Sequence, residues 1–217
     1  LHIHRVISPQ KIERIVSLAN ARNPDIVLLA GDIIDDDVRR VSKITALLKG
    51  LKASKGIYFV TGNHEFYAGY DETVRELANL GFMFLENDGA AVGKDFYLAG
   101  VPDTFAGAAY GKTPDLNRAF AKAGKGAYRL LVSHSPLDFA GRDFDLEVSG
   151  HTHGGQIFPF HVFAKLHNKY LSGLYPMPGG AEIYVSNGAG QWGPQMRFLA
   201  PSEITVLRLT PENRRNK

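Results

Sequence analysis

The sequence predicts a layered α/β fold built on one mixed sheet or on two sheets. Two observations lead to this prediction: amphipathic helices alternate with short apolar runs in the first part of the chain, and short strands dominate the rest. The composition, with 44% apolar and 22% charged residues, is that of an ordinary globular protein. The 217 residues can bury a substantial core, and we expect residues 1–217 to form a single domain.

The first part of the chain alternates between helix and strand. A helix is predicted to begin at Ser8, because serine is a favoured N-cap and Pro9 suits the first helical position. Apolar runs of strand length end in glycine followed by a polar residue, which is typical of a buried strand that opens into a loop. The predicted helices cover residues 8–20, 38–48 and 71–80, and the predicted buried strands cover residues 25–30 and 56–61.

The second part of the chain consists mainly of shorter apolar segments separated by turns. These segments predict strands over residues 82–85, 90–92, 96–101, 129–133, 146–149, 183–186 and 203–209. Small and polar residues over 106–112 predict a long surface loop rather than a domain boundary.

The composition excludes several classes of site. There is no cysteine, so disulfide scaffolds and thiolate metal sites are ruled out. Any metal must be held by His, Asp, Glu or Asn, and such ligands suit Zn, Mn, Fe or Mg better than a soft copper ion. The net charge of +3 comes without a basic stripe, so we do not expect a nucleic-acid partner.

The chain carries no sign of its own membrane span. No apolar run is long enough to cross a bilayer. The sequence starts at Leu1 without an initiator methionine. We therefore expect an upstream segment, through which the protein is membrane-associated or exported.

Polar side chains follow four of the predicted strands at the point where each strand ends. They are Asp32, Asn63, His134 and His151. Sites in layered α/β folds gather at the carboxyl ends of strands, so we expect these side chains to share one edge. All four residue types can bind a metal ion, and the sequence therefore predicts a metal site there.

Two short motifs strengthen this prediction. His151 and His153 are two residues apart, so in an extended segment both imidazoles face the same side. Glycines flank them and let the backbone approach a ligand closely. Asn63 and His64 are adjacent and diverge, so Asn63 can reach a metal while His64 points into the substrate space.

Each residue also has an ordinary explanation when it is taken alone. Gly31-Asp32 is a common turn, and asparagine is favoured in left-handed turns such as one at Asn63. His134 could flank a helix without any role. The agreement of order, spacing and strand-end placement favours the metal site. We interpret the acidic run at 35–37 as a solvated helix start, since acids favour helix N-termini.

Taken together, the motifs resemble the ordered blocks of the calcineurin-like metallophosphoesterase superfamily. The blocks are Leu1-His2, Gly31-Asp32, Gly62-Asn63-His64, Ser133-His134 and Gly150-His151-Thr152-His153, and they span most of the chain. The family's first block has an aspartate at the position before Leu1, and we expect that residue in the native protein. The resemblance implies an αββα sandwich of two mixed β-sheets flanked by helices.

The resemblance also implies a role for each residue. One of two divalent metal ions (Mn, Zn or Fe) would be held by His2, Asp32 and His153. The other would be held by Asp32, Asn63, His134 and His151, with Asp32 bridging the pair. A metal-bridging hydroxide would attack phosphorus, and His64 would assist the leaving group.

Further segments resemble a bacterial branch of this family that is often exported or membrane-anchored. They are 150–156 (GHTHGGQ), 169–175 (KYLSGLY), and Arg197 with 201–204. Some members of that branch act on lipid-linked or UDP-sugar pyrophosphates, so a phosphodiesterase or pyrophosphatase on such a substrate is expected. A phosphomonoesterase, a nuclease and a non-catalytic interaction module remain alternatives. The apolar loop predicted at 157–163 either touches lipid or packs against the body.

Overall fold

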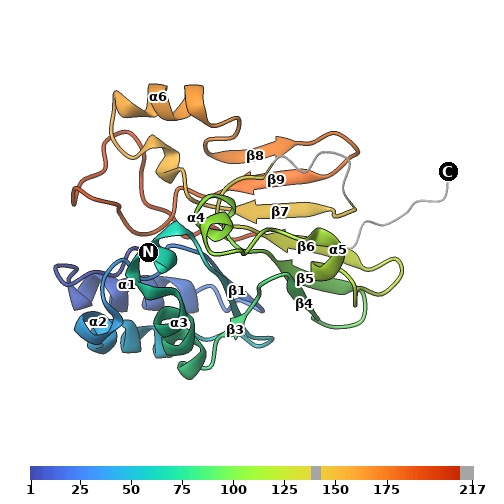
Figure 1. The fold of residues 1–217 in the computed structure, drawn as a ribbon, viewed down its shortest axis with the longest axis horizontal. Helices are drawn as coiled ribbons and strands as arrows, with labels where there is room; N and C mark the ends of the chain where they lie inside the picture. The colour runs from blue at the N-terminus through green and yellow to red at the C-terminus, as the bar shows by residue number, and fades with distance from the viewer. Residues whose placement is uncertain (138–142, 211–217) are drawn as a thin grey trace.

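Two β-sheets form the framework of the protein in a computed structural model that describes residues 1–137 and 143–210 (Figure 1). The smaller sheet is parallel, in the order β1 (Val27–Ala30), β2 (Ile57–Val60), β3 (Met83–Phe84). The larger sheet has the order β4 (Asp88–Ala91), β5 (Phe96–Gly100), β6 (Tyr128–Val132), β7 (Leu146–Ser149), β9 (Glu182–Val185), β8 (Gly173–Pro176). Its central strands are parallel, and β4 and β8 are antiparallel edges.

The core follows from the alternation of side chains along each strand. In β2, Tyr58 and Val60 join the apolar cluster between the two sheets, whereas Phe59 faces the opposite way. In β5, Leu98 joins the same inter-sheet cluster, whereas Tyr97 belongs to the cluster on the outer face of the larger sheet. The two sheets therefore pack face to face and share one apolar layer.

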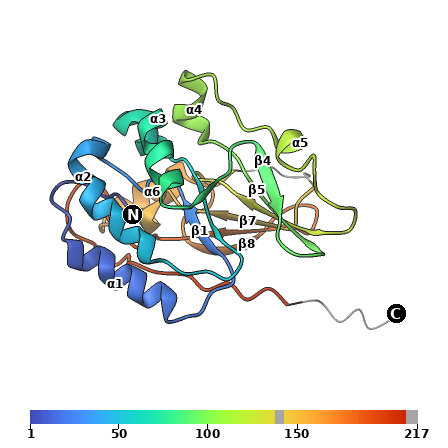
Figure 2. The same cartoon turned by 90° about the horizontal axis from the view of Figure 1, so that it is seen from below.

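Helices cover the outer faces of both sheets. The smaller sheet is covered by α1 (Pro9–Asn20), α2 (Val38–Thr45) with the 3-10 turn η1 (Ala46–Gly50), and α3 (Asn63–Asn79), which lie together on one side in Figures 1 and 2. The larger sheet packs its outer cluster against the short α5 (Leu116–Ala119) and connecting segments. The predicted αββα sandwich, with two sheets flanked by helices, is confirmed, and the outer layer on the larger sheet is the thinner one. Both sheets were predicted to be mixed, but only the larger sheet is, because every strand pair in the smaller sheet is parallel.

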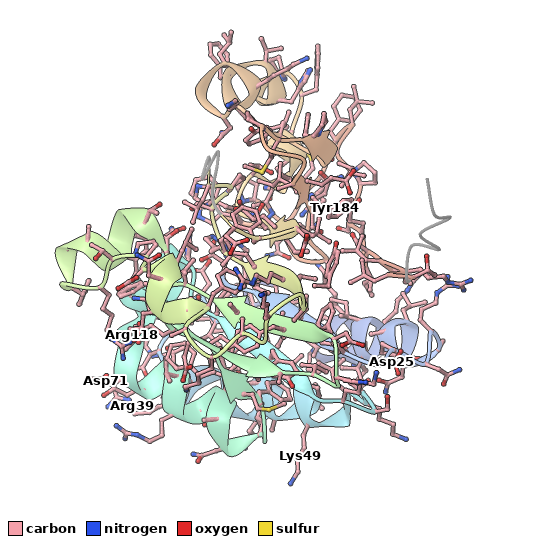
Figure 3. The ribbon with its side chains drawn as sticks, turned by 90° about the vertical axis from the view of Figure 1, so that its right-hand side faces the viewer. Asp25, Arg39, Lys49, Asp71, Arg118 and Tyr184 are labelled. Carbon is pink, nitrogen blue, oxygen red and sulfur yellow. The ribbon has the colours of Figure 1, made fainter. Side chains whose placement is uncertain are left out.

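The first helix shows the local chemistry that the sequence predicted. Ser8 is the N-cap of α1 and its hydroxyl accepts a hydrogen bond from the Lys11 amide at 3.3 Å. Ile12 and Val16 bury one face of the helix against the smaller sheet. Charged side chains on the helices, such as Arg39, Lys49 and Asp71, point outward (Figure 3).

The third helix begins earlier than predicted. The expected helix over 71–80 starts at Asn63 in the structure and ends at Asn79. Gly69, with φ 108° and ψ 94°, interrupts it and hides the periodicity of its first turns. As a consequence Asn63 and His64 lie in the first turn of a helix rather than in a loop.

Two predicted loops are wrong in part, and one predicted strand is wrong. The loop expected over 106–112 includes most of the short helix α4 (Thr104–Ala109), and the loop over 157–163 runs into α6 (Phe160–His167). The segment 203–209 is not a strand: its apolar side chains are largely exposed, and it finds no sheet edge among the described residues. Alternation alone does not make a strand without a neighbouring strand to pair with. No described helix is long and apolar enough to cross a membrane.

Candidate metal centre

The predicted site residues come together where the strands of both sheets end. Asp32 follows β1 and Asn63 follows β2 in the smaller sheet. His134 follows β6 and His151 follows β7 in the larger sheet. The site is therefore assembled across the two sheets, at their carboxyl edges, as expected for layered α/β folds.

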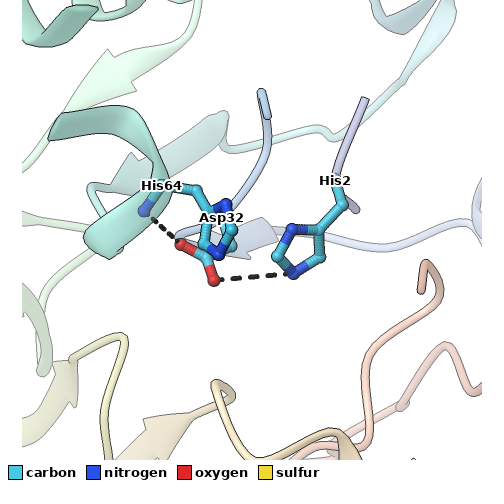
Figure 4. A group of neighbouring side chains, drawn as sticks. All are labelled: His2, Asp32 and His64. Carbon is cyan, nitrogen blue, oxygen red and sulfur yellow. Dashed lines mark hydrogen bonds and ion pairs between the residues drawn. The ribbon is translucent and has the colours of Figure 1, made fainter. Parts of the chain in front are cut away.

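Asp32 lies at the centre of the cluster. Its Oδ2 is 3.0 Å from His134 Nε2 and 3.5 Å from His2 Nε2, and Figure 4 shows the carboxylate between His2 and the backbone of His64. The His64 amide donates to the other carboxylate oxygen at 2.9 Å. Both Asp32 (4% exposed) and His134 (2% exposed) are buried.

Two further predicted ligands, His153 and His151, lie next to the histidines that face this carboxylate. His153 Nε2 is 2.9 Å from His2 Nε2, and His151 Nδ1 is 3.1 Å from His134 Nε2. Ligand atoms of His2, Asp32 and His64, and separately of Asp32, His134 and His151, lie within 4.8 Å of one another. These His and Asp groups could each hold a metal ion.

Two observations show that the residues fit divalent cations. The side-chain oxygen of Asn63 is buried beside the cluster and has no hydrogen-bond partner in the described part of the chain. An orphaned buried acceptor is costly unless something else satisfies it. In addition, ring nitrogens of His2 and His153 face each other, so they must share either a proton or a cation. Nitrogen and oxygen donors of this kind suit Mn, Zn or Fe.

Backbone strain is concentrated on the same residues. His2, Asp32, His151 and His153 all have positive φ, between 49° and 64°. This left-handed conformation costs roughly 1–2 kcal/mol for a residue with a Cβ. Strain of this kind persists where surrounding structure enforces it, commonly at functional sites.

Glu65 is a site residue that the sequence reasoning missed. Its fully buried carboxylate accepts hydrogen bonds from the backbone amides of Asp32 (2.9 Å), Ile33 (2.6 Å), Ile34 (3.0 Å) and Gly62 (2.6 Å). Burial, followed by the charge of Asp32, raises the pKa of Glu65 to about 7. The available signal was its position directly after His64, where an acid in a first helical turn can cap backbone amides.

Asp35 corrects the interpretation of the acidic run. Asp37 is indeed the N-cap of α2, as a helix start predicts. Asp35 instead turns inward, where its Oδ1 bonds His64 Nδ1 and its Oδ2 lies 3.3 Å from His2 Nδ1. Only the folded chain shows this difference, because neighbouring residues at a helix start point in different directions.

The pKa values of the cluster are set by burial, which disfavours the charged forms, and by neighbouring charges, which oppose it at several residues. Burial disfavours a charged His134, but the Asp32 carboxylate beside it prevails and raises the pKa of His134 to about 9. Asp32 is buried too, yet the pKa of its carboxyl is lowered, mainly by His134. Burial lowers the pKa of His153 well below its ordinary value. For His64, burial opposes but the Asp35 hydrogen bond and the Asp32 charge raise the pKa.

Residues 187–199, which we call the arm, close the site from the C-terminal side. Arg197 holds the arm by donating to backbone oxygens of Asn187 (2.6 Å), Gly190 (2.7 Å) and His153 (3.0 Å). Its guanidinium also lies 3.0 Å from His153 Nδ1. Gln156 donates to the Trp192 carbonyl at 2.7 Å and accepts from the Trp192 amide at 2.9 Å.

Comparison with known proteins identifies the family of this chain. Residues 2–155 match the family model described as calcineurin-like phosphoesterase. The chain belongs to this family. The match includes every residue of the predicted metal centre.

Relatives carry the corresponding name. A protein of Helicobacter pylori strain J99 named an uncharacterized metallophosphoesterase is 38% identical over 98% of this chain and 58% of its own length. A transmembrane protein with metallophosphoesterase domain from Danio rerio is 34% identical over 96% of this chain and 51% of its own length. The chain thus spans little more than half the length of these relatives.

A metallophosphoesterase of Bacillus subtilis is matched over more of its length: 30% identity, with 98% of this chain and 77% of the relative covered. The solved structure of NAD nucleotidase from Haemophilus influenzae has a TM-score of 0.53 at 19% identity, covering 82% of this chain and 38% of that chain. At this identity the likeness supports the fold alone.

Proposed function

We propose that this protein hydrolyses phosphoesters with two divalent cations. His2, Asp32 and His153 would hold one cation, and Asp32, Asn63, His134 and His151 would hold the other. The observation that carries the proposal is the position of the buried Asp32 carboxylate. One of its oxygens, Oδ2, faces both His2 and His134. A shared anion offsets the repulsion between two cations that sit close together.

The cations would supply Lewis acidity, which would polarise a phosphoryl oxygen and lower the pKa of water enough to provide hydroxide as the nucleophile at neutral pH. His64 would then protonate the leaving oxygen. Its ring is only 13% exposed, and its Nδ1 is bound to Asp35, which leaves Nε2 for the substrate. Asp35 thus acts as a positioning residue that fixes the ring and favours its protonated form.

The decisive experiment combines metal analysis with turnover of a bis(p-nitrophenyl) phosphodiester and of p-nitrophenyl phosphate, its monoester counterpart. We expect bound divalent metal, loss of turnover on chelation, and recovery when Mn²⁺, Zn²⁺ or Fe²⁺ is returned. Faster turnover of the diester supports a phosphodiesterase, and faster turnover of the monoester supports a phosphomonoesterase. Protein with neither metal nor turnover would instead be an interaction module on this scaffold.

We further propose that the natural substrate is a lipid-linked or nucleotide-sugar diester or pyrophosphate, met at a membrane surface. Support comes from α6 and the segment before it, where Phe158 (47%), Phe163 (65%) and Leu166 (81%) are exposed. Phe158 is joined to the arm by a backbone hydrogen bond to Phe198, which is 54% exposed. Several exposed apolar side chains in and next to one helix are typical of a contact with lipid.

The charge pattern favours an anionic bilayer as the partner. No acidic residue occurs from 150 to 181, whereas Lys165 and Lys169 lie in or just after α6. Sedimentation with vesicles of phosphatidylglycerol should carry the protein down, and vesicles of phosphatidylcholine should carry less. Phe163→Glu should abolish sedimentation. Val6→Glu, at a side chain that is 78% exposed in the N-terminal segment, is the matched control. Equal sedimentation of both variants would refute the contact.

A further inference from the structure

Two exposed aromatic side chains flank His64. Tyr67, in the same helix, places its ring centroid 5.5 Å from that of His64 at an interplanar angle of 69°. Trp192, from the arm, lies at 6.4 Å and 74°. Both rings are more than half exposed, at 62% and 54%. Large aromatic surfaces left in water beside a catalytic imidazole indicate a place where a ligand covers them.

Trp192 is held in this position rather than carried on a loose loop. Its backbone amide and carbonyl are both bound by the side chain of Gln156, which is 7% exposed and follows the His153 loop. Gly190, two residues earlier, approaches Leu1 so closely that a Cβ would lie 1.9 Å from the Leu1 carbonyl oxygen. The backbone that carries the indole is therefore held in place at residues 190 and 192. Such preorganisation lowers the entropic cost of binding.

The space beside Tyr67 is open. A cavity of about 560 Å³ is lined by Tyr67, Ala68, Glu72 and the segment 35–39. It includes Asp35, which binds Nδ1 of His64, and Tyr67, whose ring contacts His64, so the cavity adjoins the His64–Tyr67 pair. Its volume is within the range of pockets that hold a small organic molecule.

From this arrangement we propose that Tyr67 and Trp192 form a leaving-group subsite that binds a planar ring, such as a nucleobase, by stacking. The inference rests on the proposed function, since it takes the His64 side as the leaving-group side. It makes phosphoesters of ring-bearing alcohols the preferred substrates over esters of small alkyl alcohols. One stacked ring strengthens binding by about 10- to 100-fold.

The test compares two competitive inhibitors of the metal-loaded protein, adenosine monophosphate and ribose phosphate, which share the phosphate ester and differ in the base. Wild-type protein should bind adenosine monophosphate at least about 10-fold more tightly. Trp192→Ala and Tyr67→Ala should each remove most of that preference and leave ribose phosphate binding unchanged, whereas Trp192→Phe should keep it. Tyr110→Ala is the matched control, because Tyr110 is 57% exposed but packs on Phe66. Equal binding of the two ligands by wild type, or an intact preference in Trp192→Ala, overturns the proposal.

Fluorescence separates this inference from the catalytic one. Trp192 is the single tryptophan of the chain, so its emission reports ligand binding without turnover. Adenosine monophosphate should quench it and ribose phosphate should not, in the wild type and equally in the inactive His64→Ala variant. Quenching without any hydrolysis of the phosphodiester would refute the proposed catalysis and keep the ring subsite. Hydrolysis without quenching would refute the ring subsite and keep the proposed catalysis.

Discussion

The metal centre and the rim around it are built in opposite ways. Asp32 and His134 are buried at strand ends, and Glu65 holds the backbone around them through four amide hydrogen bonds. On the rim, Trp192 and Phe163 expose more than half of their surface on the arm and on α6. From this difference we infer that the proposed chemistry would depend on a preorganised buried network, whereas substrate choice would depend on exposed side chains that can change without disturbing that network.

The largest effect should come from breaking the centre at Asp32. Asp32→Ala removes the one carboxylate that faces both histidine groups, so both cations should be lost. We expect metal content near zero and turnover of the phosphodiester reduced by about 1000-fold or more. Metal retained at full activity in this variant would refute the assignment of Asp32.

Removing His64 should separate catalysis from metal binding. His64→Ala takes away the group that we propose protonates the leaving oxygen, so turnover should fall by about 100- to 10,000-fold. Metal content should stay near that of the wild type. Turnover of an ester whose leaving group needs no proton should fall least. A series of aryl esters with decreasing phenol pKa measures this trend. A parallel loss of metal would make His64 a ligand instead.

A substitution at Glu65 tests whether the buried residues that hold the ligand loops in place affect metal affinity as the ligands do. Glu65→Gln places an amide group against backbone amides that need an acceptor, which should disturb the loops at Asp32 and Gly62. We expect metal affinity to fall by about 10- to 100-fold, as for other residues that orient ligands. Isothermal titration measures it, and circular dichroism checks that the fold persists. An unchanged metal affinity would show that the loops at Asp32 and Gly62 keep their conformation without the Glu65 carboxylate.

The smallest effect we expect is that of pH, which should change the apparent metal affinity gradually. In the metal-free protein Asp32 holds the proton on His134, whose pKa is raised to about 9, so metal must displace that proton. Apparent affinity should therefore rise with pH, by up to about 10-fold per unit, and level off near pH 9. The stabilising His134–Asp32 pair of the metal-free protein is present at low pH and is lost as pH rises through about 9. Thermal melting with and without metal measures both trends.

The sequence predicted which polar residues lie together at the strand ends better than it predicted the segments around them, and the reason is local. Asp32, Asn63, His134 and His151 each follow a strand of apolar residues, and such a strand can be recognised from its apolar run. Segment 203–209 looked equally strand-like, but strand formation also needs a neighbour to pair with, which a linear pattern does not show. The start of α3 was missed because Gly69 interrupts its periodicity.

What the sequence determined by itself was the layered fold and the set of residues at its strand ends, because burial and backbone direction are encoded locally. Only the tertiary structure shows which of three neighbouring aspartates binds His64. It also shows that Glu65 accepts hydrogen bonds from amides of two loops, and that Trp192 lies beside His64. These contacts join residues far apart in the chain or choose between adjacent side chains. Both outcomes depend on how the two sheets and the arm pack, which no spacing in the sequence records.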